Sequence, residues 1–258
     1  MECRVISVAN QKGGVGKTTT AVNLSASLAV AEARVLLIDF DPQGNSTSGL
    51  GIDEAAINHD IYDVLVNEVP AVDSVMHTEI EGLDIIPARI ELSAAEVELI
   101  QEISRETKLK RSIASLKENY DYIFIDCPPS LGLLTVNALT ASDTVLIPMQ
   151  CEYYAMEGLK QLLSTINLIK ENLNPSLTLE GILLTMYDAK TNLSKEVVAQ
   201  VKSHFPENTF NTIVPRNVAL SEAPSFGKPI ILYQAKSRGS ECYIELAKEM
   251  LEKAKKQV

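Results

Sequence analysis

The chain contains no long apolar run. Of its 258 residues 46% are hydrophobic, but these are dispersed in short stretches. None reaches the roughly 18 to 20 consecutive apolar residues that a membrane-spanning helix needs. The opening residues, MECRVISVANQKGG, also lack the charged start, apolar core and small-residue cleavage site of a secretory signal. The sequence therefore predicts a cytoplasmic protein without a membrane span.

Cysteine and histidine are scarce. The four cysteines have no short repeat spacing, which argues against a zinc site and a disulfide framework and suits a reducing cytosol. Cys127 and Cys151 lie near the ends of predicted strands, where small buried thiols are expected. The three histidines, His59, His77 and His204, fall on predicted loops or helix surfaces, and we assign them no chemistry.

The sequence also lacks internal repeats, low-complexity tracts and linkers rich in Pro, Gly or Ser. Residues 1–258 are therefore expected to form one domain. The first predicted strand begins within a few residues of Met1, so no separate N-terminal module such as a helix-turn-helix is expected.

The formal net charge of −11 disfavours nucleic acid as a partner. The acid is concentrated in the first two-thirds of the chain, however. From Ser176 onward the chain carries 11 Lys and Arg against 9 Asp and Glu. A surface in this C-terminal third can attract phosphate although the whole molecule is acidic, and a solvated face is the alternative explanation.

Short β-rich apolar runs alternate with amphipathic stretches along the chain. The runs show little in/out alternation, which is typical of strands covered on both faces of a parallel sheet. The sequence therefore predicts an α/β fold of the P-loop type, a doubly wound, mostly parallel sheet with helices on both faces. The predicted strands are residues 4–9, 34–40, 83–88, 120–126, 143–149, 181–187 and 209–215, and the predicted helices are residues 17–31, 92–103, 107–118, 131–141, 155–173, 193–204 and 239–256.

The stretch NQKGGVGKTTT, residues 10–20, follows a predicted strand and opens a predicted helix, which is the context of a phosphate-binding loop. Glycines let backbone N–H groups approach a triphosphate, and the helix adds the positive end of its dipole. Lys17 is expected to reach the β- and γ-phosphates, and the Thr18 hydroxyl is expected to face Mg²⁺. Gln11 stands where the strict motif has its first glycine. The predicted nucleotide-binding residues are Gln11, Lys12, Gly13, Gly14, Val15, Gly16, Lys17, Thr18 and Thr19.

A second lysine in this loop needs its own explanation. Two ammonium groups in one small loop repel each other unless anions compensate them. If Lys17 takes the phosphates of its own subunit, Lys12 is free to meet a second nucleotide across a two-fold interface and to supply positive charge in trans. A simply solvated Lys12 is the alternative.

The segment KGGVGKTT resembles the deviant Walker A box of the ParA/MinD group of P-loop ATPases. In that family the early lysine acts across an ATP-sandwich dimer. The resemblance therefore implies ATP and Mg²⁺ as cofactors, a homodimer formed with ATP, and this trans role for Lys12.

The segment LLIDFDPQGN, residues 36–45, ends a predicted strand. Asp39 and Asp41 alternate along it, so their side chains are expected on one side, at the strand end where parallel sheets bind ligands. One carboxylate can organise Mg²⁺ through water and the other can orient the attacking water, whereas capping of the next turn is the alternative. The segment resembles the family's switch I, which implies that Asp41 positions or activates the water and that Asp39 supports the metal region.

The segment YIFIDCPPS, residues 122–130, is an apolar run that ends in one acid. Such a pattern is common by itself and becomes specific only downstream of the two earlier motifs. It resembles the family's switch II, with Asp126 at the strand tip near Thr18 and Mg²⁺. The double proline stops the strand and stiffens the turn. Thr18, Asp39 and Asp126 are thus the predicted metal-site residues, and Lys12, Lys17 and Asp41 the predicted catalytic ones.

The stretch TIVPRNVALSEAPSFGKPI, residues 212–230, follows the last predicted strand. Its glycine and prolines indicate an ordered loop rather than a helix. Pro215 and Asn217 match positions where the family holds the adenine, and a purely structural loop is the alternative.

The resemblance covers nearly the whole chain. IDCPPSLGLLTVNALTASD and IPMQCEYYAMEGL resemble Soj and other chromosomal ParA proteins more than MinD. This implies an ATPase with slow basal turnover, whose ATP-bound homodimer binds double-stranded DNA without sequence preference and is associated with the nucleoid. A ParB-like partner then stimulates hydrolysis and release, which moves chromosome or plasmid cargo.

Basic residues in the C-terminal third are the candidate DNA surface, because phosphate contacts need charge rather than a base-reading helix. Lys190 matches a position where chromosomal ParA proteins carry a basic DNA-contacting residue. Ala219 departs from the pattern, since close relatives usually have Arg or Lys there; reliance on other lysines, a lowered DNA affinity and an engineered replacement all remain open. The candidate DNA-binding residues are Lys190, Lys195, Arg216, Lys228 and Arg238.

Other functions remain as alternatives. A MinD-like membrane ATPase would use the tail YIELAKEMLEKAKKQV, but glutamates alternate with lysines on its polar side, so packing on the domain is expected instead. An iron–sulfur protein like the nitrogenase iron protein would need a second cysteine in the 80–120 region, where the sequence has none. A cargo-positioning ATPase without a DNA role would share the ATP box and differ in the basic surface.

Overall fold

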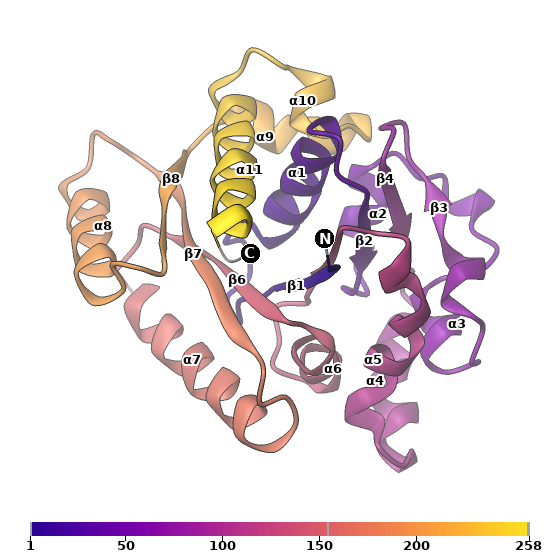
Figure 1. Cartoon of the computed structure of the whole chain (residues 1–258). Coiled ribbons are helices and arrows are strands. Elements are labelled where there is room, and N and C mark those ends of the chain that lie inside the picture. Colours follow the sequence, from indigo (N-terminus) through magenta and orange to yellow (C-terminus); the bar gives the residue numbers. More distant parts are fainter. Residues whose placement is uncertain (1, 154, 257–258) are drawn as a thin grey trace.

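The computed structural model describes residues 2–153 and 155–256. Its centre is a sheet with the strand order β3-β4-β2-β5-β1-β6-β7-β8 (Figure 1). All neighbouring strands are parallel except β3, which pairs antiparallel with β4. The mostly parallel sheet that the sequence predicts is therefore confirmed. The strands are β1 (Arg4–Val8), β2 (Val35–Asp39), β3 (Met76–His77), β4 (Leu83–Ile86), β5 (Tyr122–Asp126), β6 (Thr144–Gln150), β7 (Thr178–Tyr187) and β8 (Thr209–Pro215).

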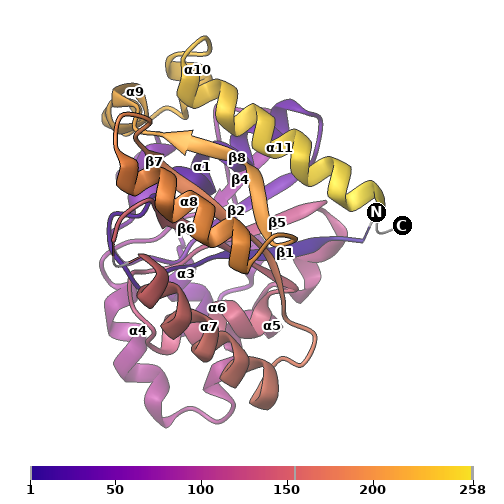
Figure 2. The same ribbon diagram turned by 90° about the vertical axis from the view of Figure 1, so that its left-hand side faces the viewer.

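Helices cover both faces of the sheet (Figure 2). The central strands β1, β2 and β5 are almost completely buried because each face has its own apolar layer. On one face lie α1 (Lys17–Val30), α9 (Val218–Glu222), α10 (Ile230–Tyr233) and α11 (Arg238–Lys256), and on the other lie α3 (Ile61–Leu65), α4 (Leu92–Glu98), α5 (Lys108–Ser112), α6 (Leu133–Ala141), α7 (Ala155–Asn172) and α8 (Asn192–His204). The short α2 (Asn45–Gly49) packs against α1.

The C-terminal helix α11 packs on the domain, as its charge pattern predicts. It contacts α1 and β8 along its length (Figure 1). Tyr243, Leu246 and Met250 are buried, and the Tyr243 hydroxyl lies 3.2 Å from Thr20 Oγ1. The apolar face of the tail is therefore occupied by the protein itself. Within residues 2–153 and 155–256, no helix combines the length and apolarity needed to cross a bilayer.

Two expectations about local structure are wrong. The stretch 212–230 is not a continuous loop, because Asn217 caps α9 by accepting a hydrogen bond from Leu220 N, and a 3-10 turn, Ala223–Phe226, follows directly. His77 lies in the short edge strand β3 rather than in a loop or helix. The short elements α2, α3 and β3 have no counterpart among the predicted elements, because they are too short for hydrophobic periodicity to reveal.

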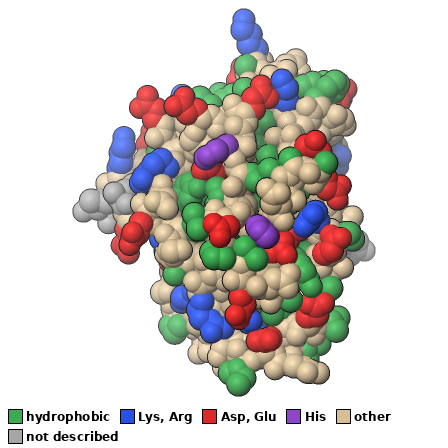
Figure 3. Space-filling view, turned by 90° about the vertical axis from the view of Figure 1, so that its right-hand side faces the viewer, with side chains coloured by type: hydrophobic (Ala, Val, Ile, Leu, Met, Phe, Trp, Pro, Cys, Tyr) green, Lys and Arg blue, Asp and Glu red, His purple; other side chains and the backbone are tan. Residues whose placement is uncertain are grey.

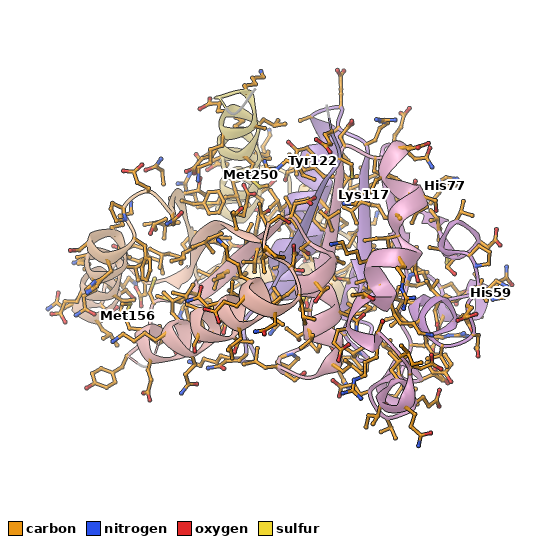
Figure 4. All side chains as sticks on the ribbon, turned by 60° about the horizontal axis from the view of Figure 1, so that its bottom comes forward. His59, His77, Lys117, Tyr122, Met156 and Met250 are labelled. Atoms are coloured by element: carbon orange, nitrogen blue, oxygen red, sulfur yellow. The ribbon has the colours of Figure 1, made fainter. Side chains whose placement is uncertain are left out.

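The histidines remain without an assigned role. His77 Nδ1 lies 2.7 Å from Asp84 Oδ1, and His59 lies 3.8 Å from Asp63 Oδ2. Figure 4 shows His59 and His77 at the edge formed by α3 and β3, at the opposite end of the view from Met156 on α7. Figure 3 shows that acidic side chains are spread over this face of the molecule together with basic ones, several of which lie close together in its lower part.

Candidate functional site

The phosphate-binding loop joins β1 to α1. Gly14 and Gly16 have φ angles of 71° and 88°, in the left-handed region that a residue with a Cβ rarely adopts. The loop borders a cavity of about 330 Å³ at the carboxyl edge of the sheet, and the helix dipole of α1 favours negative charge there. This cavity is lined by Gly13, Gly14, Gly16, Lys17, Thr18, Thr19, Asp41, Gln43, Asn45, Pro129 and Met186.

The two lysines of the loop point in different directions. Lys17 is 7% exposed and lines the cavity, where its Nζ donates a hydrogen bond to Lys12 O at 3.2 Å. Burial lowers the pKa of Lys17, although nearby carboxylates including Asp126 oppose this shift. The side chain of Lys12 is 43% exposed, and its Nζ pairs with Glu152 Oε2 at 3.0 Å. Of the two lysines, only Lys17 lines the phosphate cavity of its own subunit.

Asp39 and Asp126 meet at the ends of adjacent strands. They are register partners in the β2–β5 pair, and both are fully buried. Asp39 Oδ2 accepts hydrogen bonds from Thr47 N at 2.8 Å and from Thr47 Oγ1 at 2.7 Å, while Asp39 Oδ1 accepts one from Asp41 N at 3.3 Å. Burial raises the pKa of both Asp39 and Asp126. Asp39 thus holds the backbone that follows β2 in place.

The residues around Asp126 fit a magnesium ion. Asp126 Oδ2 accepts a hydrogen bond from Ser46 Oγ at 2.8 Å, whereas Oδ1 is buried without a partner. The Thr18 hydroxyl is close enough to oppose the rise in the pKa of Asp126. The described residues contain no cluster of three or more His, Cys, Asp or Glu that could hold a metal by itself. A hydroxyl, one carboxylate and nucleotide phosphates are the usual ligand set for Mg²⁺ in such a site.

Asp41 lies on the wall of the phosphate cavity. Its carboxylate is 7% exposed, and Oδ1 accepts a hydrogen bond from Gln43 N at 3.0 Å. This bond closes a local turn, which is the alternative role that the sequence suggests for Asp41. It uses only one of the two carboxylate oxygens. Asp41 lines the cavity, and a water that attacks a bound phosphate would be held at this cavity wall.

A second cavity, of about 530 Å³, lies beside the loop at the end of β8. Gly16, Thr19 and Met186 border both cavities, so the two lie next to each other along the loop. Pro215 and Asn217, the residues predicted to contact the adenine, line this second cavity. The remaining lining residues are Thr185, Met186, Val214, Arg216, Val218, Leu220, Ser221, Pro224 and Tyr243.

Residues from β6 and β7 also contact the loop, and sequence reasoning missed them. Gln150 Nε2 donates to Gly14 O at 2.6 Å, and Thr185 Oγ1 donates to Val15 O at 2.9 Å. Their separation from the loop by more than a hundred residues hides this contact in the sequence. The available signal was a polar residue at the end of each apolar run, IPMQ and ILLT.

The candidate DNA-binding residues form two groups. Lys190 follows β7 and Lys195 lies in the first turns of α8, and both are exposed, with no ion pair to another described residue. Arg216 is close to the end of β7, because its N donates to Tyr187 O at 3.1 Å. Lys228 pairs with Glu79 at 3.6 Å, and Arg238 at the start of α11 pairs with glutamates of its own helix.

Comparisons with known proteins agree with this geometry. A family described as "AAA domain" matches residues 3–179. The sporulation initiation inhibitor protein Soj of Bacillus subtilis is 59% identical over 247 residues, which are 96% of this chain and 98% of Soj. The chromosome partitioning protein ParA of Myxococcus xanthus is 56% identical over 250 residues, covering 97% of this chain and 88% of that protein.

A solved structure has the same fold with ligands present. It is a cobyrinic acid a,c-diamide synthase of Mycobacterium smegmatis with bound ADP and magnesium, 38% identical, with a TM-score of 0.87 over 99% of this chain and 97% of the other. The same protein is also solved with an ATP analogue and magnesium, with a TM-score of 0.86. These structures support ATP and Mg²⁺ as the ligands of the loop. The chain belongs to the ParA/MinD family of P-loop ATPases and groups within it with the Soj and ParA chromosome-partitioning proteins.

Proposed function

We propose that residues 1–258 form one P-loop ATPase domain that partitions DNA. The ATP-bound protein pairs face to face as a homodimer, and this dimer binds double-stranded DNA of the nucleoid without sequence preference. A ParB-like partner stimulates hydrolysis and thereby releases the dimer, so that a chromosome or plasmid cargo is moved. Similarity to partitioning proteins over nearly the whole chain supports this function.

The position of Lys12 is the observation that supports the proposed dimer. Its ammonium group lies outside the cavity of its own subunit, on the rim, where it pairs with Glu152. A half-exposed ion pair of this kind is weak, about 0 to 1 kcal/mol. A phosphate group of a second subunit's nucleotide carries more charge than one carboxylate and would compete for Lys12. Lys12 then supplies positive charge to the transferred phosphoryl group in trans.

Hydrolysis is assigned to residues that line the phosphate cavity. Lys17 holds the β- and γ-phosphates, Asp41 orients the attacking water, and Thr18 and Asp126 would hold Mg²⁺. When bound, Mg²⁺ neutralises charge on the phosphate oxygens. Asp39, the third predicted metal-site residue, supports the metal region indirectly, because both of its oxygens accept hydrogen bonds that keep the segment after β2 in position. The reaction needs positioning rather than a covalent intermediate, and the slow basal rate is the one that the resemblance to partitioning ATPases implies.

DNA binding is assigned to the basic residues near the ends of β7 and β8. Lys190, Lys195 and Arg216 are exposed there, and Lys228 and Arg238 extend the basic surface on a separate segment. Each phosphate contact is weak and salt-dependent, so a single subunit binds poorly. Two copies in one dimer gain through multivalency, which would make DNA binding depend on ATP.

A mobility-shift experiment tests this function. The protein is mixed with a DNA duplex of arbitrary sequence in the presence of ATP, ADP or no nucleotide, and its oligomeric state is followed by light scattering. We expect retention of DNA and a dimer with ATP alone, and loss of both in Lys12→Ala with some nucleotide binding kept. A persistent monomer with ATP, or equal DNA retention under all three conditions, would contradict the proposal.

A further inference from the structure

The direction of each backbone N–H in the phosphate-binding loop is fixed by the carbonyl that precedes it. In a trans peptide the C=O of one residue and the N–H of the next point in opposite directions, and the described residues contain no cis peptide bond. The Gly14 carbonyl accepts a hydrogen bond from Gln150 Nε2 at 2.6 Å, and the Val15 carbonyl accepts one from Thr185 Oγ1 at 2.9 Å. The N–H groups of Val15 and Gly16 therefore point away from these two donors.

The two donors contact the loop from outside the lining of the phosphate cavity. Gly14 and Gly16 line that cavity, whereas neither Gln150 nor Thr185 does. Thr185 is buried, and it borders the second cavity beside the loop. Since the carbonyls are held on the far side, the two N–H groups that point away from the donors are directed to the side where phosphates would bind.

The donors belong to two hydrogen-bonded strands of the central sheet. Gln150 and Thr185 are register partners at the carboxyl ends of the parallel strands β6 and β7. The backbone continues the pairing beyond them, because Cys151 N donates to Thr185 O at 3.2 Å. The Gln150 amide also lies 2.9 Å from Met186 Sδ, so this side chain is held at more than one point. One rung of the sheet thus fixes two successive peptide groups of the loop.

The loop needs such support because its own sequence does not define its conformation. Gly14 and Gly16 occupy left-handed conformations, and glycine reaches many other conformations at little cost. A loop that moves freely would lose entropy when it closes around phosphates, whereas a loop held in its binding geometry would not. Successive N–H groups that point into one concavity are a typical anion site.

We propose that Gln150 and Thr185 are positioning residues for nucleotide phosphates. By holding the carbonyls of Gly14 and Val15, they aim the amides of Val15 and Gly16 into the phosphate cavity before a nucleoside diphosphate or triphosphate arrives. They act through the backbone and touch no phosphate themselves. This inference concerns nucleotide binding and does not depend on DNA or on a partner protein.

Substitutions that remove one donor at a time test the proposal. Thr185→Val keeps the shape of the side chain and removes the hydroxyl, while Thr185→Ser keeps the hydroxyl. We expect Thr185→Val to weaken Mg-ADP binding about tenfold in isothermal titration calorimetry, because the Gly16 amide is then no longer held toward the charged phosphates, and Thr185→Ser to stay within about threefold of the parent. Gln150→Met, which removes the other donor, should weaken binding by a similar factor.

Matched controls separate positioning from general destabilisation. Thr140→Val removes a hydroxyl that is equally buried but has no hydrogen-bond partner, and Gln200→Met makes the same change as Gln150→Met on the exposed surface of α8. Both controls should bind Mg-ADP like the parent. If Thr185→Val and Gln150→Met also bind like the parent, the proposal is overturned, even if their melting temperatures fall.

A second measurement reads the loop directly. In ¹⁵N-edited NMR spectra, the amides of Val15 and Gly16 should shift strongly when Mg-ADP binds to the parent, and each should shift less in the variant that lacks its own donor. Gln150→Met should affect the Val15 amide most, and Thr185→Val the Gly16 amide. Unchanged shifts of both amides in both variants would overturn the proposal. Since Gln150 is only half-buried, its variant also keeps the test open if Thr185→Val does not fold.

Discussion

Glu152 binds Lys12 and Arg216 at the same time. Glu152 Oε2 lies 3.0 Å from Lys12 Nζ, and Glu152 Oε1 lies 3.4 Å from Arg216 Nη2. One carboxylate therefore links the lysine proposed to act on a second subunit with an arginine proposed to contact DNA. In the single subunit both cations are partly neutralised by the same group. If Lys12 turned to the nucleotide of a second subunit, Glu152 would keep only its ion pair with Arg216.

Removing the charge of Glu152 should favour the dimer. In Glu152→Gln the ion pair to Lys12 is lost, and Lys12 is free to meet the phosphates of a second subunit. Exposed ion pairs are worth about 0.2–1 kcal/mol, so we expect the concentration of a non-hydrolysable ATP analogue at half-dimerisation to fall by up to about fivefold. Light scattering during titration measures this. Glu157→Gln, an exposed carboxylate in the first turn of α7, is the control, and weaker dimerisation of Glu152→Gln than of this control would contradict the prediction.

Asp41→Ala should trap the ATP-bound dimer. The alanine cannot orient the attacking water, but it leaves Lys17 and the loop unchanged, so ATP still binds. A positioned acid–base or water-orienting group typically contributes about 10²- to 10⁴-fold, and phosphate release should fall by at least about a hundredfold. Size-exclusion chromatography with ATP should then show a long-lived dimer. Turnover equal to that of the parent would remove Asp41 from the catalytic role.

The sequence predicts the sheet because the buried strands are uniform apolar runs. Strands such as β2 and β5 carry one recognisable pattern each, and their terminal acids Asp39 and Asp126 meet because parallel strands end at one edge. The local motifs therefore predict the position of the nucleotide cavity as well. Lys17 and Thr18 are adjacent in the chain, so their proximity in the site follows from the sequence alone.

Contacts between distant polar residues are what the sequence does not reveal. Gln150 and Thr185 each end an apolar run, and nothing in either run identifies a glycine loop as the partner. The pairing of Lys12 with Glu152 depends on where the chain turns after β6. Helix α9 is not predicted from the sequence. It is capped by one hydrogen bond, which Leu220 N donates to the side-chain oxygen of Asn217.

The depressed pKa of Lys17 should make nucleotide binding take up protons at alkaline pH. Burial lowers the pKa of Lys17 in the free protein, and bound phosphates favour its charged form and raise the pKa again. Between these two values binding is accompanied by proton uptake, and affinity falls as the pH rises through this window. Calorimetry at a pH of ~9 in two buffers with different ionisation enthalpies measures the uptake.

The control for this pH dependence is Lys17→Arg, because a guanidinium stays protonated throughout the range. Whatever its affinity, this variant should show no proton uptake that depends on position 17. In the parent the uptake that depends on Lys17 should grow as the pH rises, because the free protein loses the charge of Lys17 more readily than the nucleotide-bound protein. Uptake that is equal in parent and variant at alkaline pH would assign the proton to another residue.

Lys190→Glu should weaken DNA binding without affecting basal turnover. Lys190 is exposed in the turn between β7 and α8 and is not among the residues that line the phosphate cavity, so we expect nucleotide binding to be kept. Each lost phosphate contact lowers the slope of log K against log salt by about one. Because a dimer carries two copies, we expect the slope to fall by about one to two. Fluorescence anisotropy of a labelled duplex at several salt concentrations, with ATP present, measures this.

The control must distinguish a local contact from the change in net charge. Lys110→Glu makes the same charge change at an exposed position of α5, which lies in the acidic part of the chain and carries no candidate DNA-binding residue. If binding depended only on the overall field, both variants would lose affinity alike, because net charge acts at long range and is screened by salt. A direct phosphate contact instead predicts a loss and a smaller salt slope in Lys190→Glu alone. Equal retention of DNA by both variants at low salt would exclude Lys190 from the DNA surface and leave Lys195 and Arg216 as the residues to test.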